Sequence, residues 1–402
     1  MSPVLPVVLF TVRKDPTLAH LFQDGTFNSF GPSAILAQEA QSPLVGVAGA
    51  KPAELRGQIR LMAPNRPGVY GMLDRNGQLI YVGKAKNLRT RLQSYFRRKS
   101  RPPKAGRIIA HAKKIVWEVV PSEFASLLRE LELIRRWRPR FNVQGQPLRR
   151  RLTFVCLGRA PAPYLFLARN ISSRVQTAFG PITASKQAQE AVRRLNDWFQ
   201  LRDCSQPQEM IFPDQGELFP GIRPAGCLRL EIGTCLGPCT GTCTRRDYQQ
   251  QARRAREFLS GNDLTPLQAM QAEMQAAAEA QQFERAAALR DRWTAVHWLA
   301  ERLQRVRKAQ REMSFIYPVV GFDGSRAWYL IHGARAVAVV EAPRDSATRK
   351  AAREKIAAIY RHRGELLDTY EHADSMMVVM QWFRKHPTER SRCLSPEDAR
   401  AC

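Results

Sequence analysis

Two short strands joined by a tight turn open the most strongly patterned part of this 402-residue chain. Residues 68–73 (GVYGML) and 78–83 (QLIYVG) are rich in strand-forming residues, and Asn76-Gly77 between them is a hairpin signal. Residues 84–98 place apolar side chains at helical spacing between basic ones, which predicts an amphipathic helix. The pattern therefore predicts a β-hairpin followed closely by a helix.

A third strand and a second helix complete this unit. Residues 115–120 (IVWEVV) form a strand-type run. Ser122 is a suitable N-cap for a helix over residues 124–137, which must end before Pro139. The predicted order is therefore β-β-α-β-α, and the chain as a whole is expected to be of the α+β class.

The charge of the chain indicates an extended polyanionic partner. The sequence has 63 Lys and Arg against 36 Asp and Glu, a net charge of +27. The excess is concentrated between Lys84 and Arg151, where 20 basic residues face four acidic ones, a net of +16. A basic protein kept soluble by its charge is the alternative, but the concentration of the charge favours nucleic acid.

The expected cellular compartment follows from the absence of a membrane span and of a signal peptide in the sequence, and from the spacing of its cysteines. No apolar run reaches about 18 residues, so no membrane span is expected, and the first ten residues make a poor signal peptide. Three of the eight cysteines, Cys235, Cys239 and Cys243, recur at every fourth residue. Without an export signal, such crowding favours a metal or iron–sulfur site over disulfides, and a reducing cytoplasm is expected.

Five segments are expected along the chain. The first has no motif, the second is the unit described above, and the third holds two strands, a helix and the cysteines. The fourth is strongly helical, and the fifth, with three strands and two helices, reads as a small α/β module. Their bounds are residues 1–62, 63–145, 146–262, 263–312 and 313–402.

The second segment carries a motif that resembles a known nuclease family. GVY (68–70) is followed by YVG (81–83), and residues 81–96 are similar to the UvrC-type GIY-YIG nuclease at nearly every position, with Glu130 and RPRFN (138–142) at the expected distances. The resemblance implies a small, mainly antiparallel sheet flanked by helices for this domain. It also implies catalytic or supporting roles for Tyr70, Tyr81, Gly83, Lys84, Arg91, Tyr95, Glu130 and Asn142.

These residue types suit hydrolysis of a phosphodiester. Glu130 is the one acid of the region suited to hold a hard divalent cation, a single Mg²⁺ or Mn²⁺, with water filling most of the shell. Arg91 can stabilise charge on the phosphate. Either Tyr70 or Tyr81, with Tyr81 preferred, can accept the proton of the attacking water.

The roles of the tyrosine base and of Glu130 each depend on neighbouring charged groups. A phenol needs its pKa lowered, by the metal or by Lys84, to act as a base at neutral pH. Glu130 taken alone would be expected to pair with Arg135 or Arg136 at the helix surface. The basic run at residues 97–107 is expected to follow DNA phosphates, although part of it can be a solvated charged face.

The cysteines resemble the four-iron, four-sulfur cluster of the same family. GTCLGPC (233–239), FGP (179–181) and LRDC (201–204) look like its parts, so the resemblance implies ligation by Cys204, Cys227, Cys235 and Cys239. A four-cysteine Zn²⁺ site is the alternative. The gap between Cys204 and Cys227 is longer than the family suggests and contains Pro213, Gly216, Pro220 and Gly221, which leaves open whether Cys243 replaces Cys204.

Residues 268–293 resemble the UVR motif, a helical hairpin that docks on UvrB. Leu267, Met270, Met274 and Ala277 form one apolar stripe, and a second begins at Phe283. The diagnostic part, FERAAALRD (283–291), implies partner contacts by Phe283, Glu284, Ala287, Leu289 and Arg290. An intramolecular coiled-coil arm is the alternative.

Together the resemblance covers residues 64–312 and implies an excision-repair endonuclease of UvrC or Cho type. It is expected to cut damaged double-stranded DNA on the 3′ side of a lesion, recruited by a UvrB-like helicase subunit after UvrA. The acids of the tail fit no nuclease pattern, so a truncated protein without the RNase H-like half is expected. A stand-alone GIY-YIG enzyme outside repair and a non-catalytic DNA-binding UvrB adaptor are the alternatives.

Overall fold

The computed structural model describes residues 27–36, 44–97, 103–143, 152–204, 208–213, 226–361 and 373–401. The chain divides into two compact units. The first comprises residues 1–145, 318–329 and 338–352, and the second comprises residues 146–317, 330–337 and 353–402. The expectations for residues 98–102 of the basic run and for Gly216, Pro220 and Gly221 of the insertion lie outside the described residues.

The first unit is built on a four-stranded antiparallel sheet in the order β1-β4-β2-β3. Its strands are β1 (Val45–Ala48), β2 (Gly68–Leu73), β3 (Leu79–Ala85) and β4 (Lys114–Val119). The predicted hairpin is confirmed: the Asp74 carboxylate accepts hydrogen bonds from the backbone N–H groups of Asn76 and Gln78, and Gly77 has a positive φ of 75°. The edge strand β1 and helix α1 (Pro52–Met62) come from a segment in which no motif was expected.

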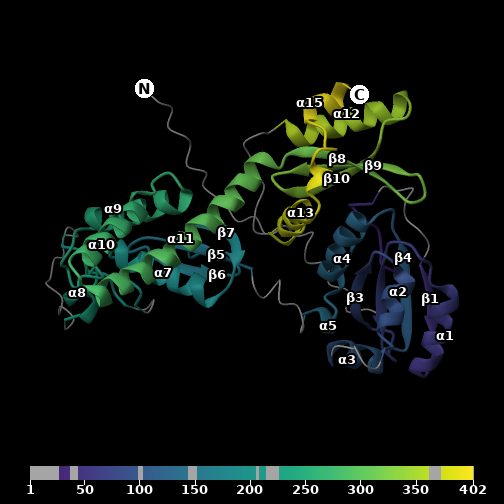
Figure 1. Ribbon diagram of the computed structural model, residues 1–402, viewed down its shortest axis with the longest axis horizontal. Helices are drawn as coiled ribbons and strands as arrows, with labels where there is room; N and C mark the ends of the chain where they lie inside the picture. The colour runs from purple at the N-terminus through teal and green to yellow at the C-terminus, as the bar shows by residue number, and fades with distance from the viewer. Residues whose placement is uncertain are drawn as a thin grey trace. The chain divides into compact units, whose positions relative to one another are not determined.

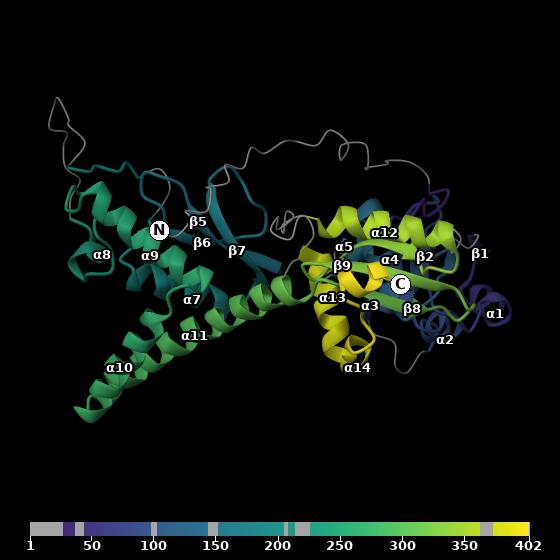
Figure 2. The same cartoon turned by 90° about the horizontal axis from the view of Figure 1, so that it is seen from above.

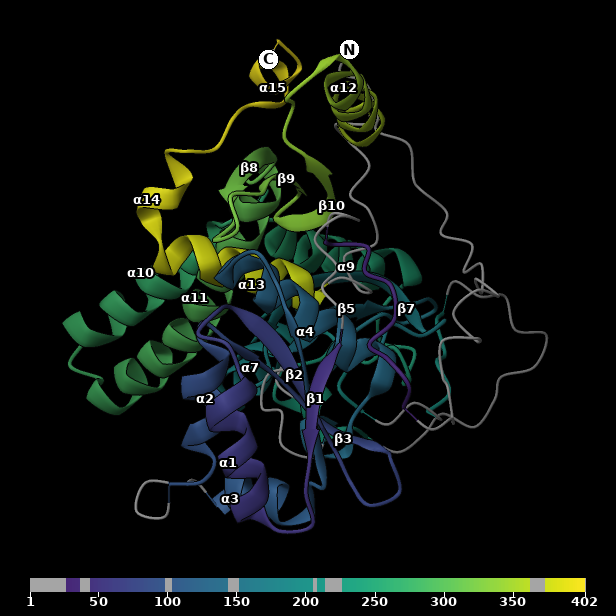
Figure 3. The same cartoon turned by 90° about the vertical axis from the view of Figure 1, so that its right-hand side faces the viewer.

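Helices cover both faces of this sheet (Figures 1 and 3). Apolar residues of α1, α2 (Leu88–Ser94) and α3 (Pro103–His111) pack with Tyr70 and Trp117 in one core. Helix α4 (Glu123–Trp137) packs its Leu133 and Ile134 against Val69 and Val82 on the opposite face. The alternation of side chains along β2 therefore divides the sheet between two cores.

The predicted helix over residues 84–98 is shorter than expected. Strand β3 continues through Ala85, because that residue pairs with Gly68 of β2. Asn87 then caps α2 by accepting a hydrogen bond from the backbone N–H of Thr90. By contrast, α4 begins after its Ser122 cap as predicted, and the short helix α5 (Arg140–Val143) follows it.

A buried ion-pair network ties the segment at residues 27–36 to α4. The Arg129 guanidinium pairs with Glu118 (Nη2–Oε2 3.0 Å) and Glu132 (Nη1–Oε2 2.7 Å). It also donates to the backbone carbonyls of Gly31 and Pro32. Since Arg129 and Glu118 are both buried, these contacts replace the water that each charge has lost.

The second unit begins with a three-stranded antiparallel sheet in the order β6-β5-β7. Its elements are β5 (Leu152–Gly158), β6 (Leu165–Ala168), β7 (Val175–Thr183) and the helix α7 (Lys186–Trp198). Strand β7 was not expected, and the FGP sequence at 179–181 lies within it. The predicted helix begins at its N-cap Ser185.

Three further helices pack beside this sheet. They are α9 (Arg245–Ser260), α10 (Thr265–Glu279) and α11 (Phe283–Glu312), and the short α8 (Leu228–Glu231) precedes them. Figure 2 shows α10 alongside the first half of α11 as a helical hairpin. Apolar residues of α7, α9 and α11 share one core with β5, including Phe258 and Leu299.

The final segment contains the three strands and two helices that the sequence predicts. Strands β8 (Phe315–Val320), β9 (Arg326–His332) and β10 (Arg335–Glu341) form a sheet in the order β10-β9-β8. The helices are α12 (Ser346–Tyr360) and α13 (Ala373–Lys385), followed by the short α14 (Pro387–Arg390) and α15 (Pro396–Ala401). Among the described helices of the chain, none is long and apolar enough to cross a membrane.

Candidate active site

Three tyrosines from β2, β3 and the end of α2 meet on one side of the first unit's sheet. The rings of Tyr70, Tyr81 and Tyr95 lie with centroids 6.0–6.2 Å apart. The hydroxyl oxygens of Tyr70 and Tyr95 are 2.9 Å apart and share a hydrogen bond. The structure thus gathers three residues of which the first and last, Tyr70 and Tyr95, are 25 positions apart in the sequence.

Gly83 permits this packing. It pairs with Tyr70 across the β2–β3 hairpin, and a Cβ atom at position 83 would collide with the Tyr70 hydroxyl. Glycine is therefore required here by the close approach of the ring.

Arg91 joins the cluster from the last turn of α2. Its Nε donates to the Tyr70 hydroxyl oxygen at 3.2 Å, and its guanidinium carbon lies 5.4 Å from the centroid of the Tyr95 ring. The Tyr70 side chain is sealed, with 0% exposure, and its hydroxyl already has two partners. Tyr81 is only half-buried, so of the two candidate bases it is the one that reaches solvent.

Glu130 approaches the same cluster from α4. Its Oε1 accepts a hydrogen bond from the backbone N–H of Lys84 at 3.2 Å. Burial raises the pKa of this carboxyl to about 7, although the nearby charges of Lys84 and Arg91 oppose the shift. The Arg136 guanidinium, one expected surface partner, instead donates to the carbonyls of Phe30 and Pro32.

The donor set at Glu130 fits a hard divalent cation. Burial disfavours the carboxylate charge, which a cation would compensate, and a single carboxylate with water completing the shell is a common Mg²⁺ environment. Within the described parts of the chain, no cluster of three or more His, Cys, Asp or Glu side chains is placed to hold a metal. A site here would therefore rest on one protein carboxylate, as the sequence predicts.

The electrostatics of the tyrosines differ from the expectation about Lys84. Burial raises the pKa of Tyr81 above that of a free phenol, and the charge of Glu130 adds to the increase. Arg91, rather than Lys84, is the group that lowers this pKa. Lys84 acts on Glu130 instead, through its backbone N–H and its charge.

Asn142 braces the strand that carries the site. Its Oδ1 accepts from the Val82 backbone N–H at 2.7 Å, and its Nδ2 donates to the Val82 carbonyl at 2.8 Å. The side chain is 3% exposed. Since its amide is used in fixing β3 between Tyr81 and Gly83, Asn142 positions the site and does not face it.

Lys104 is a site neighbour that the motif does not include. Its Nζ lies 5.7 Å from the centroid of the Tyr81 ring, from the first turn of α3. Burial and the neighbouring Arg107 lower its pKa. Its place in the basic run at residues 97–107 was the available signal, but nothing in that run distinguished it from the other lysines and arginines.

The four cysteines named as cluster ligands are neighbours in the second unit. Burial raises the pKa of Cys235 to about 11, and the nearby Cys204 and Cys227 add to the increase. The same two cysteines raise the pKa of Cys239. Cys243 instead lies in the apolar core with Phe212 and Tyr248.

The loop around Cys235 is shaped for a sulfur ligand. The backbone N–H of Gly237 donates to the Cys235 Sγ at 3.4 Å, and Gly237 has a positive φ of 68°. Such N–H donors favour a charged thiolate. The four thiols do not, however, converge to metal-binding geometry in the described residues.

The helical hairpin leaves one large apolar side chain uncovered. Phe283, the first residue of α11, is 70% exposed. Leu289 of α11 is buried, as are Met270 and Ala277 of α10, and the two helices pack together, so part of the predicted apolar stripe is covered within the protein. Glu284 and Arg290 are exposed, and Ala287 is half-buried.

Comparison with known proteins matches three successive parts of the chain. Residues 66–143 match the UvrC-like GIY-YIG domain, residues 153–258 the middle domain of UvrC/Cho excinucleases, and residues 265–296 the UvrB/uvrC motif. The GIY-YIG N-terminal endonuclease domain of Thermotoga maritima UvrC, solved with its catalytic magnesium, is 37% identical. The alignment covers 22% of this chain and 94% of that domain, with a TM-score of 0.20.

A point mutant of the same Thermotoga maritima domain, bound to its catalytic divalent cation, matches similarly. It is 36% identical, with coverage of 22% of this chain and 94% of that domain and a TM-score of 0.20.

Proposed function

Because the chain belongs to the UvrC family of GIY-YIG excision-repair endonucleases, we propose that it makes the incision on the 3′ side of a DNA lesion. The observation that supports this most is the meeting of Tyr70, Tyr81 and Arg91 beside Glu130. In this grouping Glu130 offers a carboxylate to bind a cation, a tyrosine offers a phenol to accept a proton, and Arg91 offers a guanidinium to contact a phosphate.

In the proposed reaction each residue has a separate task. Glu130 would hold one Mg²⁺ or Mn²⁺, which supplies Lewis-acid charge to the scissile phosphate when bound. Tyr81 is the more accessible of the two candidate bases, and because burial raises its pKa, it would accept the proton of the attacking water only while the bound cation offsets that effect. Arg91, exposed apart from its bond to Tyr70, is free to stabilise phosphate charge.

The remaining motif residues position these groups. Lys84 holds the Glu130 carboxylate through its backbone N–H, and Tyr95 fixes the Tyr70 hydroxyl. Asn142 holds the strand of Tyr81 through Val82. Rigid support of this kind matters because small displacements of reacting groups cost large factors in rate.

We further propose that the α10–α11 hairpin recruits the enzyme by docking on UvrB. The exposed Phe283 ring offers an aromatic anchor, the kind of side chain that dominates binding energy at interfaces. UvrA would act before this step by delivering UvrB to damaged double-stranded DNA.

The cysteine region is proposed to hold a four-iron, four-sulfur cluster, with Zn²⁺ as the alternative. Cys204 and Cys227 raise the pKa of both Cys235 and Cys239, and the Gly237 N–H already donates to the Cys235 sulfur. Cys243 packs in the apolar core with Phe212 and Tyr248, and it is not among the cysteines that raise the pKa of Cys235 and Cys239, which favours Cys204 as the fourth ligand.

The position of the cut tests the proposed function. A duplex with one defined lesion is labelled separately at each end of the damaged strand and incubated with the protein, UvrA and UvrB. A single product on the 3′ side, dependent on a divalent cation, is expected. A 5′-side product that survives Glu130→Gln would reveal a second nuclease, and no cutting with UvrA and UvrB present would overturn the proposal.

A further inference from the structure

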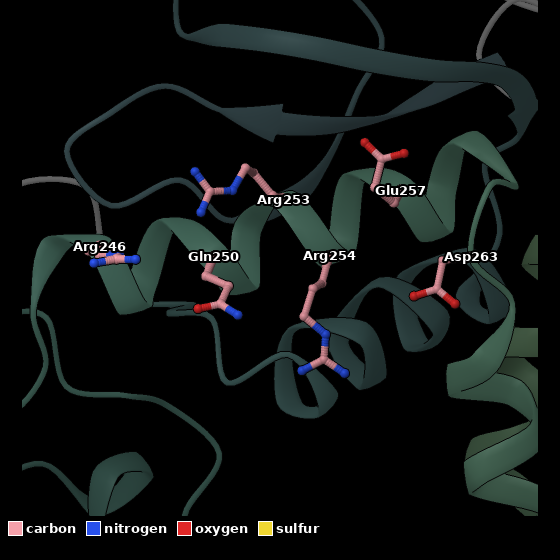
Figure 4. A pocket seen from close by; sticks show the side chains of 6 residues that line it. All are labelled: Arg246, Gln250, Arg253, Arg254, Glu257 and Asp263. Atoms are coloured by element: carbon pink, nitrogen blue, oxygen red, sulfur yellow. The ribbon is translucent and has the colours of Figure 1, made fainter. Parts of the chain in front are cut away.

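Helix α9 presents an arginine-rich face to solvent in the second unit. Its buried residues, among them Tyr248, Ala255 and Phe258, lie on the opposite side. The exposed side carries a shallow recess of about 460 Å³. It is lined by Arg246, Gln250, Arg253, Arg254, Glu257 and Asp263 (Figure 4).

The arginines of this recess are little used by the protein itself. Arg246 and Arg253 form no hydrogen bond or ion pair with any residue that the structure describes. Arg254 donates to Gln251 at 3.2 Å, a neutral partner. Exposed arginines on a helix commonly pair with acids three or four positions away, but Gln250 occupies the position four residues after Arg246. Glu257 lies four residues after Arg253 and three after Arg254, and its carboxylate instead pairs with Arg256 and accepts from Asn262.

The two carboxylates of the recess are occupied in the turn that follows α9. Glu257 accepts from Asn262 Nδ2 at 2.7 Å and pairs with Arg256 at 3.3 Å. Asp263 accepts two hydrogen bonds from Thr265, at 2.9 and 2.6 Å, which lower its pKa, and the charge of Arg254 lowers it further. They therefore stabilise the connection to α10, and the opposite end of the recess keeps its positive charge.

We propose that the face of α9 from Arg246 to Arg254 binds the sugar–phosphate backbone of duplex DNA, as a contact outside the nuclease residues. The inference rests on the proposed function, because it takes the enzyme's substrate as the partner. Eight residues of helix span about 12 Å, over which one DNA strand presents roughly three or four phosphates at about 3.4 Å each.

The chemistry of the face suits phosphate better than other partners. A guanidinium forms paired hydrogen bonds with phosphate oxygens. The recess is open, and its lining contains no aromatic or aliphatic side chain to receive an apolar partner. Contacts of this kind give affinity and orientation without sequence readout, as a repair enzyme for many sequences requires.

Salt dependence of DNA binding tests the proposal on the full-length protein. The variant Arg246→Gln, Arg253→Gln, Arg254→Gln is compared with wild type on undamaged duplex without divalent cation, so that no cutting occurs. Each phosphate contact contributes about 0.9 to the slope of log affinity against log salt, so the slope should fall by about 2–3. The corresponding Arg→Lys variant should retain the wild-type slope.

A matched control removes the same charge elsewhere. Arg349→Gln, Lys350→Gln, Lys355→Gln replaces exposed residues of α12, and its slope should stay near that of wild type. Equal slopes for the α9 variant and wild type would overturn the proposal, as would an equal fall in both triple variants. Unchanged DNA binding with weakened UvrB binding would assign the face to an acidic protein instead.

The proposed function can fail independently. If wild-type protein binds duplex but does not cut lesion-containing DNA, the nuclease assignment is wrong while the salt comparison still decides the role of α9. Thermal unfolding of all variants should be unchanged, since every substituted side chain is exposed.

Discussion

Replacing Arg129 with Met should strongly destabilise the first unit. All five hydrogen bonds of the Arg129 guanidinium are made inside the protein, to Glu118, Glu132, Gly31 and Pro32. Methionine fills the space of the aliphatic stem but leaves the buried Glu118 without its cation. Removing one member of a buried pair costs about 3–5 kcal/mol, a large share of the roughly 5–15 kcal/mol that stabilises a typical domain.

The pH dependence of this loss gives a second check. Burial raises the pKa of Glu118 even with Arg129 present, and without Arg129 the pKa should rise further. A carboxyl with a raised folded-state pKa stabilises the fold below its unfolded pKa, and that stabilisation is lost as pH rises through the folded pKa. The loss of stability caused by Arg129→Met should therefore be smaller near pH 5 than near pH 8.

Hydrogen exchange measures this loss locally. The free energy of opening is read from amides of β2 and β4, which belong to the first unit. Lys86→Met, which breaks an exposed pair with Glu123 in the same unit, is the control and should change stability by no more than about 0.5 kcal/mol. A loss below about 1 kcal/mol, or one that does not vary with pH, would refute the reasoning. Recovery in Arg129→Met combined with Glu118→Leu would support it.

Three further changes test other parts of the account. Phe283→Ala should weaken association with UvrB by about 2 kcal/mol, and unchanged affinity in a binding titration would make the hairpin an internal arm. Protein purified without oxygen should be brown, with a visible absorption band that Cys235→Ser removes and Cys393→Ser keeps; stoichiometric zinc without iron would decide for the alternative. Gly83→Ala should destabilise the first unit by about 1–3 kcal/mol, because the added methyl group would clash with Tyr70. Gly57→Ala on the open face of α1 is the control and should stabilise the unit slightly. Equal effects of the two substitutions would contradict the packing argument.

The fold predictions that the structure confirms rest on sequence signals that act over a few residues. The turn at Asn76-Gly77 and the Ser122 cap act within a few residues, so the hairpin and α4 follow from sequence alone. Strand β1 was missed because it has four residues and pairs with β4, some 70 positions further along the chain. The start of α2 was wrong because cross-strand pairing with Gly68 holds Ala85 in β3.

The candidate site likewise has features that the sequence indicated and others that it did not. The motif identified the residues that gather around Tyr70, because their types and spacing are readable without a structure. The sequence did not indicate that the Asn142 amide forms hydrogen bonds with the Val82 backbone, or that Lys104 lies over the Tyr81 ring. Both contacts depend on the path of the chain through α3 and α5. The Arg129 network was also hidden, since charged residues on a helix ordinarily lie at the surface.

The proposed role of Glu130 is tested most directly by the rate of a single turnover. A complex of UvrB with a labelled duplex that carries one defined lesion, formed with UvrA, is mixed with wild-type protein or with Glu130→Gln, and cutting is followed in the presence of Mg²⁺. The variant should bind DNA as tightly as wild type yet cut about a hundredfold more slowly or worse, a loss of about 2.7 kcal/mol in transition-state stabilisation. Cutting by Glu130→Gln at a near wild-type rate would contradict the assignment of the cation to this carboxylate.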